Sequence, residues 1–279
     1  MVSSMPLVEN EGLKLMVRAL RILHVAPGEP FGGIQKLVVE LAAHQLKNGL
    51  EVSVLWTGAA DRASAICQQY GVRTNVASGG FLQRFFRARS ALRHQSADIL
   101  HLHMPPPWIA LLLPTLSGAK CVHLHGKVVA RDTLQARVTS HFEKRIVRQA
   151  DILVAISSWI QTVWLAKYPT ADIVRVFNGV PVPADIRMQP ARAKRDFPII
   201  GFASRLAADK GVSEFIEFVV EMNKIMPNVR FLVAGDGPER PAIERRLEFL
   251  VRDGTVRLLG HIDDMSLFWR QLDLSVFCA

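Results

Sequence analysis

Two basic residues, Arg205 and Lys210, follow a short apolar run in the segment GFASRLAADKG, residues 201–211. A strand ending before Arg205 and a helix beginning after Lys210 would add the partial positive charge of the helix N-terminus to the two cations. These features favour a diphosphate, because each charge-assisted hydrogen bond contributes about 1.5–3 kcal/mol. The same cations could stabilise a departing diphosphate without a metal ion. Two solvated loop cations are the alternative interpretation.

Glycines follow other predicted strands. Gly32 and Gly33, in HVAPGEPFGGIQK, could bring backbone N–H groups to a phosphate or sugar at a helix N-terminus. Their spacing matches neither the dinucleotide-binding fingerprint nor the P-loop. Asp236 follows Gly235 in GDGPER, and Gly260 ends the run VRLLG, where the backbone could approach a nucleotide base. Tight turns explain these glycines equally well.

Two histidine pairs occupy neighbouring predicted strands. His101 and His103 are two residues apart, as are His123 and His125, so each pair faces one side of its strand. A metal site is conceivable, but no Asp or Glu lies beside them in the sequence, and we expect no metal. Buried histidines that form hydrogen bonds are the expected state. His125 is the one best placed to reach a substrate, because it ends its strand before Gly126.

A basic aromatic segment, FLQRFFRARSALRHQ at residues 81–95, has apolar residues at roughly helical spacing. A helix of this kind can lie on an anionic lipid surface. An ordinary covering helix with a solvated basic face explains the same pattern, and we prefer this interpretation.

Short apolar runs alternate with amphipathic helical patterns along the whole chain. Strands without polar alternation, separated by helices, indicate parallel sheets buried on both faces. In the pattern at residues 33–47, Gly49 is the expected end of the helix. The predicted strands are 21–26, 51–55, 98–103, 120–125, 151–155 and 173–177, followed by a second series at 198–203, 230–234, 256–259 and 274–277.

The two series of strands predict two Rossmann-like lobes. The segment NGVPVPADIRMQPARAKRD between them is rich in proline and lacks periodicity, which is typical of a linker. We expect a poorly ordered leader at 1–19, a first lobe at 20–180, a linker at 181–196 and a second lobe at 197–279. Ligands bind beyond the carboxyl ends of parallel strands, so two lobes would place a ligand in the cleft between them.

Composition narrows the class of protein. The chain has 279 residues, of which 49% are hydrophobic and 21% charged, as expected for globular domains. The net charge of +9 favours anionic partners, although no nucleic-acid recognition motif is visible. Three dispersed cysteines suit a reducing cytoplasm. The apolar run at 108–116 is far shorter than the roughly 20 residues that span a membrane.

Taken in order, the motifs resemble the family 4 glycosyltransferases, retaining enzymes of the GT-B architecture. The resemblance covers nearly everything from Arg21 to Ala279, and although each motif alone is weak, the ordered set is quite specific. The motifs are GGIQK, HLHG at His123–Gly126, VAISSWI at Val154–Ile160, FNGV at Phe177–Val180, SRLAADKG, GDGPER and VRLLGHI.

The resemblance implies an α/β fold of two Rossmann-like lobes facing a cleft. It also implies a cytoplasmic enzyme, acting in cell-surface polysaccharide synthesis, that moves a sugar from a nucleotide-diphosphate sugar to a saccharide or lipid-linked acceptor with retention. Neither a divalent metal nor another cofactor is expected, and neither is a nucleic-acid partner. Peripheral contact with an anionic membrane at its inner face is a further expectation.

Site residues are carried over from the family at matching positions. Arg205 and Lys210 look like the pair that grips the donor diphosphate, and Gly33 looks like a contact to the phosphate–sugar region. His125 looks like the histidine that contacts the transferred sugar. The expected catalytic residues are therefore His125, Arg205 and Lys210, and the expected donor-binding residues are Gly32, Gly33, Arg205, Lys210, Gly235, Asp236 and Gly260.

The sequence also departs from the family pattern. Family members continue past LDLSVF into a segment with two glutamates separated by seven residues, and this chain stops at Ala279, before such a segment. We therefore expect the second lobe to be incomplete and its last strand, 274–277, to present a hydrophobic edge. The alternatives are a catalytically dead nucleotide-sugar-binding protein and an epimerase acting on nucleotide sugars, for which the strand ends offer few carboxylates.

Overall fold

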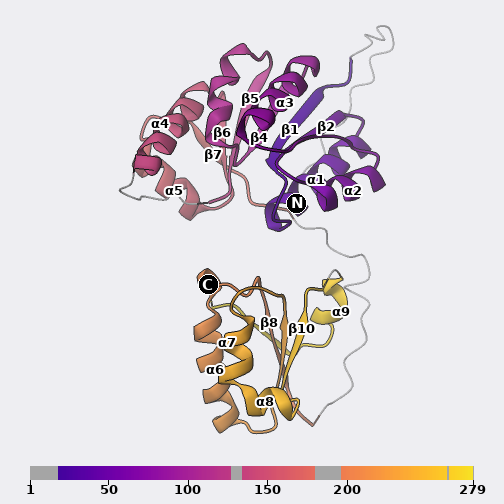
Figure 1. Cartoon of the computed structure of the whole chain (residues 1–279), viewed down its shortest axis with the longest axis vertical. Coiled ribbons are helices and arrows are strands. Elements are labelled where there is room, and N and C mark those ends of the chain that lie inside the picture. The colour runs from indigo at the N-terminus through magenta and orange to yellow at the C-terminus, as the bar shows by residue number, and fades with distance from the viewer. Residues whose placement is uncertain (1–17, 127–133, 180–195, 263, 279) are drawn as a thin grey trace, which may run out of the picture. The chain divides into compact units, whose positions relative to one another are not determined.

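The computed structural model describes residues 18–126, 134–179, 196–262 and 264–278. The chain divides into two compact units, Met1–Pro181 and Val182–Ala279 (Figure 1). The first is coloured indigo to pink and the second orange to yellow. The leader expected at 1–19 and the linker expected at 181–196 lie largely outside the described residues, so these boundaries stay predictions.

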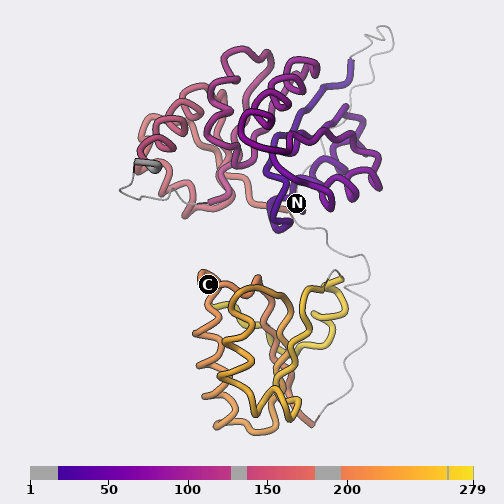
Figure 2. The backbone as a smooth tube through the Cα atoms, in the orientation of Figure 1, coloured from indigo at the N-terminus to yellow at the C-terminus, as the bar shows by residue number. Residues whose placement is uncertain are grey.

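Unit 1 contains a seven-stranded sheet in the order β3-β2-β1-β4-β5-β6-β7. All neighbouring strands in it are parallel, and the continuous backbone path can be followed in Figure 2. The strands are β1 (Arg21–Pro27), β2 (Glu51–Thr57), β3 (Arg73–Ala77), β4 (Ile99–His103), β5 (Ala119–Leu124), β6 (Ile152–Ala155) and β7 (Ile173–Arg175).

The edge strand β3 is the one strand of this sheet that the sequence pattern does not predict. Its sequence, RTNVA, is mostly exposed, and only Ala77 is fully buried. An edge strand pairs on one side only and tolerates polar residues, so it lacks the continuous apolar run that marks a central strand.

Helices cover both faces of this sheet. Ala26 and Val54 pack with α1 (Gly33–Lys47) and α2 (Asp61–Gln69) on one face. Leu23 and Val25, which alternate with them, pack on the other face with α3 (Phe81–His94), α4 (Leu134–Gln149), α5 (Ser158–Lys167) and the 3₁₀ turn η1 (Pro107–Leu111). As expected, α1 ends before Gly49, whose φ of +82° suits glycine.

Unit 2 contains a four-stranded parallel sheet in the order β10-β9-β8-β11. One face packs on α6–α8 through residues such as Phe202 and Phe231. On the other face, Leu232 packs in a cluster with Phe268 of α9 and with Leu272, which follows α9. The elements are β8 (Ile199–Ala203), η4 (Ala208–Lys210), α6 (Val212–Ile225), β9 (Arg230–Ala234), α7 (Arg240–Arg246), α8 (Glu248–Arg252), β10 (Val256–Gly260), α9 (Met265–Trp269) and β11 (Leu274–Val276).

The predicted α/β class with two parallel sheets is confirmed. Among the described strands, β11 pairs with β8 and lies at one edge of the sheet. Leu274 on β11 and Phe277 directly after it are 55% and 71% exposed.

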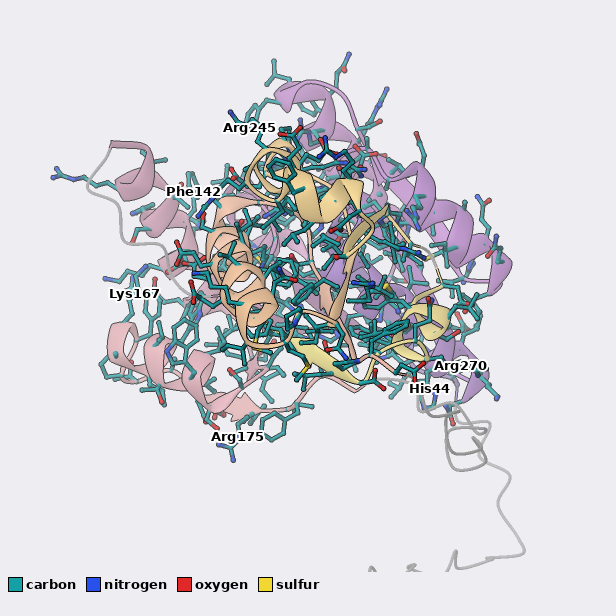
Figure 3. The ribbon with its side chains drawn as sticks, turned by 90° about the horizontal axis from the view of Figure 1, so that it is seen from below. His44, Phe142, Lys167, Arg175, Arg245 and Arg270 are labelled. Atoms are coloured by element: carbon teal, nitrogen blue, oxygen red, sulfur yellow. The ribbon has the colours of Figure 1, made fainter. Side chains whose placement is uncertain are left out.

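Charged side chains lie on the outside of each unit. Figure 3 shows exposed basic residues such as Lys167 and Arg175 of unit 1 and Arg245 of unit 2. Among the described helices, none combines the length and apolar character needed to cross a bilayer. The apolar run at 108–116 instead forms 3₁₀ turns whose Ile109 and Leu113 are fully buried in the core.

Candidate functional site

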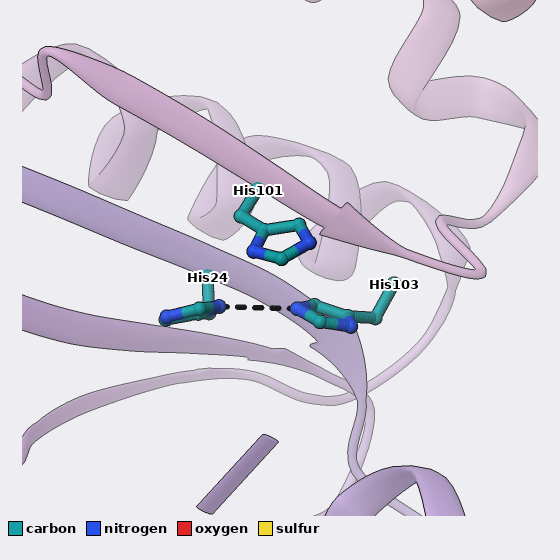
Figure 4. Close-up of side chains that lie close together, drawn as sticks. All are labelled: His24, His101 and His103. Carbon is teal, nitrogen blue, oxygen red and sulfur yellow. Dashed lines mark hydrogen bonds between the residues drawn. The ribbon is translucent and has the colours of Figure 1, made fainter. Parts of the chain in front are cut away.

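Five histidines gather on one face of the unit 1 sheet, toward the carboxyl ends of its central strands. His24 comes from β1, His101 and His103 from β4, His123 from β5, and His125 directly follows β5. The parallel register places His24 beside His101 and His103 beside His123. Because alternate residues of a strand share a face, all five rings meet. Figure 4 shows three of them, with His101 lying beside the bonded pair His24 and His103.

Three of the imidazoles form a continuous series of hydrogen bonds. Nε2 of His24 lies 2.7 Å from Oε1 of Gln45 on α1, and Nδ1 of His24 lies 3.0 Å from Nε2 of His103. Nδ1 of His103 in turn lies 3.1 Å from Nε2 of His125. The side chains in this series belong to separate elements, so only the folded sheet brings them together.

The remaining two rings pack against this series. His101 and His123 are parallel to within 1° with centroids 5.3 Å apart, and His123 stacks on His125 at 4.4 Å. Nε2 of His101 and both ring nitrogens of His123 are buried without a hydrogen-bond partner within the described parts of the chain. These two rings contribute stacking contacts and exclude water from the hydrogen-bonded series.

Burial keeps the cluster neutral. Desolvation lowers the pKa of His24 and of His123 to about 4, that of His125 to about 3 and that of His101 to about 2. The pKa of His103 lies well below its usual value for the same reason, with added repulsion from the neighbouring imidazoles. At neutral pH, each ring therefore carries one N–H and one lone pair.

Neutral imidazoles are also ligands for transition metals. Two groups, His24 with His101 and His103, and His103 with His123 and His125, each bring three ring nitrogens within 4.8 Å of one another. However, three short contacts pair nitrogens with other polar atoms. The lone pairs at these contacts are engaged in hydrogen bonds. The expectation that no metal binds stays a prediction.

The loop between β1 and α1 borders the same edge of the sheet. Gln35 fixes it, because its Oε1 accepts from the N–H of Gly32 at 2.9 Å and its Nε2 donates to the carbonyl of Pro27 at 2.9 Å. Gly33 begins α1, and a Cβ added there meets no atom within 4 Å. The space beside Gly33 is therefore open to a ligand.

The predicted cation pair lies in the loop between β8 and α6 of unit 2. Nη2 of Arg205 is 3.2 Å from Oδ1 of Asp209, and Nζ of Lys210 is 3.8 Å from Oδ2 of the same carboxylate. The side chains of Arg205 and Lys210 are 58% and 42% exposed. The two cations thus converge on one anionic group rather than pointing apart.

The backbone after the cation pair requires glycine. Gly211 has a φ of +67° and precedes the first residue of α6. A Cβ there would collide with the carbonyl of Cys278. Within the described residues, no side chain caps the N-terminus of α6, so its first N–H groups can reach a ligand beside Lys210.

The other predicted donor-binding residues of unit 2 have a clear structural role. Gly235 has a φ of +128°, donates to the carbonyl of Gly260 at 2.7 Å, and would collide with the carbonyl oxygen of Ser204 if it carried a Cβ. Asp236 accepts from the N–H of Gly237 at 2.8 Å. Close packing of strand-end turns explains these residues. Their contact with a donor stays a prediction.

Sequence reasoning missed His24, Gln45 and Asp209. His24 sits within an apolar run, and Gln45 lies on an amphipathic helix, so neither has a local signal. His24 could have been found only by knowing that its strand, β1, lies beside the strand that carries His101 and His103. That knowledge requires the order of strands in the sheet.

A hollow of about 300 Å³ lies at the opposite, amino-terminal edge of the unit 1 sheet. Its lining includes Arg21, Ser53 and Gln95. Arg21 is held there by Asp98, with Nη2 and Oδ1 3.2 Å apart. Since ligands of parallel sheets bind at the carboxyl edge, the histidine edge and the cation loop remain the candidate sites.

Two family models match the chain. The model described as Glycosyltransferase Family 4 matches residues 31–182. The model described as Glycosyl transferases group 1 matches residues 197–279. Together they cover both units.

Curated relatives include several sugar-transferring proteins. The chain is 25% identical over 248 residues to a phosphatidylinositol N-acetylglucosaminyltransferase subunit of Arabidopsis thaliana, covering 83% of this chain and 55% of that one. It is 27% identical over 177 residues to 2-deoxystreptamine glucosyltransferase of Streptomyces kanamyceticus, covering 54% of this chain and 45% of that one. The chain thus spans about half the length of these relatives.

Solved structures share the fold. The complex of Anabaena Alr3699/HepE with UDP-glucose matches with a TM-score of 0.70 and 16% identity, over 92% of this chain and 73% of that one. The pneumococcal O-GlcNAc transferase GtfA in complex with UDP and GlcNAc matches with a TM-score of 0.71 and 11% identity, over 93% and 79%. Both units therefore have the folds found in GT-B glycosyltransferases.

Proposed function

The chain belongs to Glycosyltransferase Family 4, and from this premise we propose that it transfers a sugar from a nucleoside-diphosphate sugar to an acceptor. Relatives named as an N-acetylglucosaminyltransferase and a glucosyltransferase support this proposal. So do structures of the same fold in complex with UDP-glucose or with UDP and GlcNAc.

The observation that carries the proposal is the convergence of Arg205 and Lys210 on the carboxylate of Asp209. Two cations that reach one carboxylate can also reach one pyrophosphate, which carries more negative charge and more acceptor oxygens. The uncapped N-terminus of α6 adds further N–H donors at the same place. A diphosphate would displace Asp209, because that carboxylate is 61% exposed and readily rehydrated.

In the proposed reaction, the bond between the sugar C1 and the diphosphate oxygen breaks, and the bonding electron pair leaves with the diphosphate. Arg205 and Lys210 stabilise the charge that develops on this leaving group, without a divalent metal. The acceptor hydroxyl attacks C1 on the face from which the diphosphate departs and passes its proton to that leaving group. The product keeps the anomeric configuration of the donor. His125 and Gly33 contact the transferred sugar and the phosphate–sugar region.

We further propose a saccharide or lipid-linked acceptor and a role in cell-surface polysaccharide synthesis. The names of two relatives support this proposal, because one contains phosphatidylinositol, a lipid, and the other contains 2-deoxystreptamine, a compound with several hydroxyl groups. Helix α3 supports a peripheral contact with anionic lipid, because Phe81, Leu82 and Phe86 are 61%, 67% and 56% exposed beside arginines. Flotation with anionic and with neutral vesicles tests this contact, and absence of binding to the anionic vesicles rejects it.

Titration calorimetry with nucleoside diphosphates tests the cation pair. Arg205→Ala or Lys210→Ala should weaken binding at least tenfold, or about 1.4 kcal/mol. Arg245→Ala is the control, since it removes another exposed arginine, on α7, and should leave the affinity unchanged. Unchanged affinity in both site variants would remove the diphosphate assignment.

Gly33→Ala separates ligand contact from folding. Because the new methyl group meets no protein atom within 4 Å, the variant should fold normally and yet lose donor affinity or turnover. A transfer assay, with the anomer of the product identified by NMR, then tests the reaction and its retention. Donor binding without turnover would support the alternative of a catalytically inactive nucleotide-sugar-binding protein.

A further inference from the structure

The hydrogen bonds of the histidine cluster have a direction. The 2.7 Å contact joins Nε2 of His24 to the amide oxygen of Gln45, and because that oxygen only accepts, the proton is assigned to Nε2 of His24. A neutral imidazole has one N–H, which leaves Nδ1 of His24 as an acceptor. His103 must then donate from Nε2 across the 3.0 Å contact.

The same reasoning continues to the end of the series. With its proton on Nε2, His103 offers the lone pair of Nδ1 to His125 at 3.1 Å. His125 must therefore donate from Nε2, and its own Nδ1 is left unprotonated. The tautomer of each ring is therefore set by its hydrogen bond to the ring before it, and the amide of Gln45 sets the first.

We propose that Gln45, His24 and His103 are positioning residues that hold His125 in the Nε2–H tautomer and present its Nδ1 as a hydrogen-bond acceptor. An acceptor of this kind recognises a neutral donor such as a sugar hydroxyl and gives no attraction to a carboxylate or phosphate. The identity of that hydroxyl group rests on the proposed function. The tautomer itself does not.

Several features of the cluster support a fixed rather than a fluctuating arrangement. His24 and His103 are fully buried, so water does not compete for their nitrogens. The rings of His101 and His123 pack against the series with centroids 4.1 to 5.2 Å apart, and His123 stacks on His125. A hydrogen bond in such an environment is stronger than in water, and leaving its partner unsatisfied is costly.

A matched pair of variants separates the series from its surroundings. His103 and His123 are neighbours in the sheet register, at adjacent strands. His103→Phe keeps a ring and breaks two hydrogen bonds of the series, whereas His123→Phe keeps a ring and removes nitrogens without a partner in the described part of the chain. The steric change is the same in both variants.

Nitrogen NMR of the whole chain with ¹⁵N-labelled histidine tests the proposal directly. Two-bond couplings between ring protons and nitrogens report which nitrogen is protonated. At neutral pH, His24, His103 and His125 should each be protonated at Nε2. Gln45→Met should shift the ring nitrogens of His125, two imidazoles away. His44→Ala, which removes the exposed neighbouring histidine of α1, should not.

Three outcomes would overturn the proposal: a proton on Nδ1 of His125, an unchanged His125 spectrum in folded Gln45→Met, or stoichiometric zinc bound to these nitrogens in the purified protein. If the chain transfers sugar, His103→Phe should lower kcat/KM at least tenfold and more than His123→Phe does. His44→Ala, outside the cluster, should lower it less than twofold. Absence of all transfer would reject the proposed function and leave the NMR test of the tautomer intact.

Discussion

The two units place opposite chemistries near the carboxyl ends of their strands. Unit 1 gathers five uncharged imidazoles, most of them buried, and unit 2 presents two exposed cations that share one carboxylate. The difference follows from solvation. A charge remains stable where water reaches it, while a group enclosed between strands and stacked rings keeps its neutral form. Neutral groups therefore recognise a ligand through the direction of their hydrogen bonds, whereas exposed cations recognise it through its negative charge.

The largest expected difference between the two units is their loss of stability in acid. Burial lowers the pKa of His24 from 6.5 to about 4. Between these pH values, His24 therefore binds a proton in the unfolded chain but not in the folded chain. Stability of unit 1 therefore falls as the pH drops from about 6.5 toward 4. At about 1.4 kcal/mol per pKa unit, His24 alone accounts for roughly 3 kcal/mol.

Urea unfolding at pH 7 and pH 4 measures this loss. Unit 2 contains a single histidine, His261, and serves as the internal reference. Replacing Trp269 with Phe leaves only unit 1 tryptophans as fluorescence probes, and far-UV circular dichroism reports both units. An equal loss in the two units would contradict the assignment of acid sensitivity to the imidazole cluster.

Two glycine variants, one in each unit, distinguish a glycine required for backbone packing from one expected to contact a ligand. Gly235→Ala introduces a methyl group against the carbonyl of Ser204 at a φ of +128°. Strain of this kind costs about 1–3 kcal/mol, and the steric overlap adds to it, so unit 2 should lose stability. Gly33→Ala in unit 1, where the methyl group is unhindered, should change stability by less than about 0.5 kcal/mol.

Thermal unfolding of both variants gives the measurement. In Gly235→Ala, unit 2 should unfold first, as followed by the fluorescence of Trp269. The unfolding temperature of unit 1 should not change. Equal stability of Gly235→Ala and the parent chain would show that the turn after β9 adapts to a side chain.

The smallest expected effect concerns Asp209. Asp209→Asn removes the carboxylate that competes for Arg205 and Lys210, and exposed ion pairs contribute about 0.2–1 kcal/mol. Nucleoside-diphosphate affinity should therefore rise by about 1.4-fold to fivefold at low salt, with the gain shrinking as salt is added. Glu221→Gln is the matched control, since it removes the same charge from the exposed pair with Lys224 on α6. A weaker affinity in Asp209→Asn would mean that Asp209 orders the two cations for the ligand.

Most elements were predictable because their signals are local. The apolar run around Leu23 and Val25 predicts β1, and the amphipathic pattern before Gly49 predicts α1 with its end. The exposed strand β3 could not be predicted, because an edge strand with Arg73 and Asn75 lacks an apolar run. Arg205 and Lys210 were recognisable for the same local reason, since they are five positions apart in one loop.

The sequence by itself determined the two parallel sheets, the cation loop and the residues at most strand ends, because periodicity, glycine and charge act over a few neighbouring positions. The tertiary structure alone decided that His24 joins His103 and that Gln45 ends their series. Strand order, register and side-chain direction make these contacts, and they bring together residues as distant in sequence as His24 and His125.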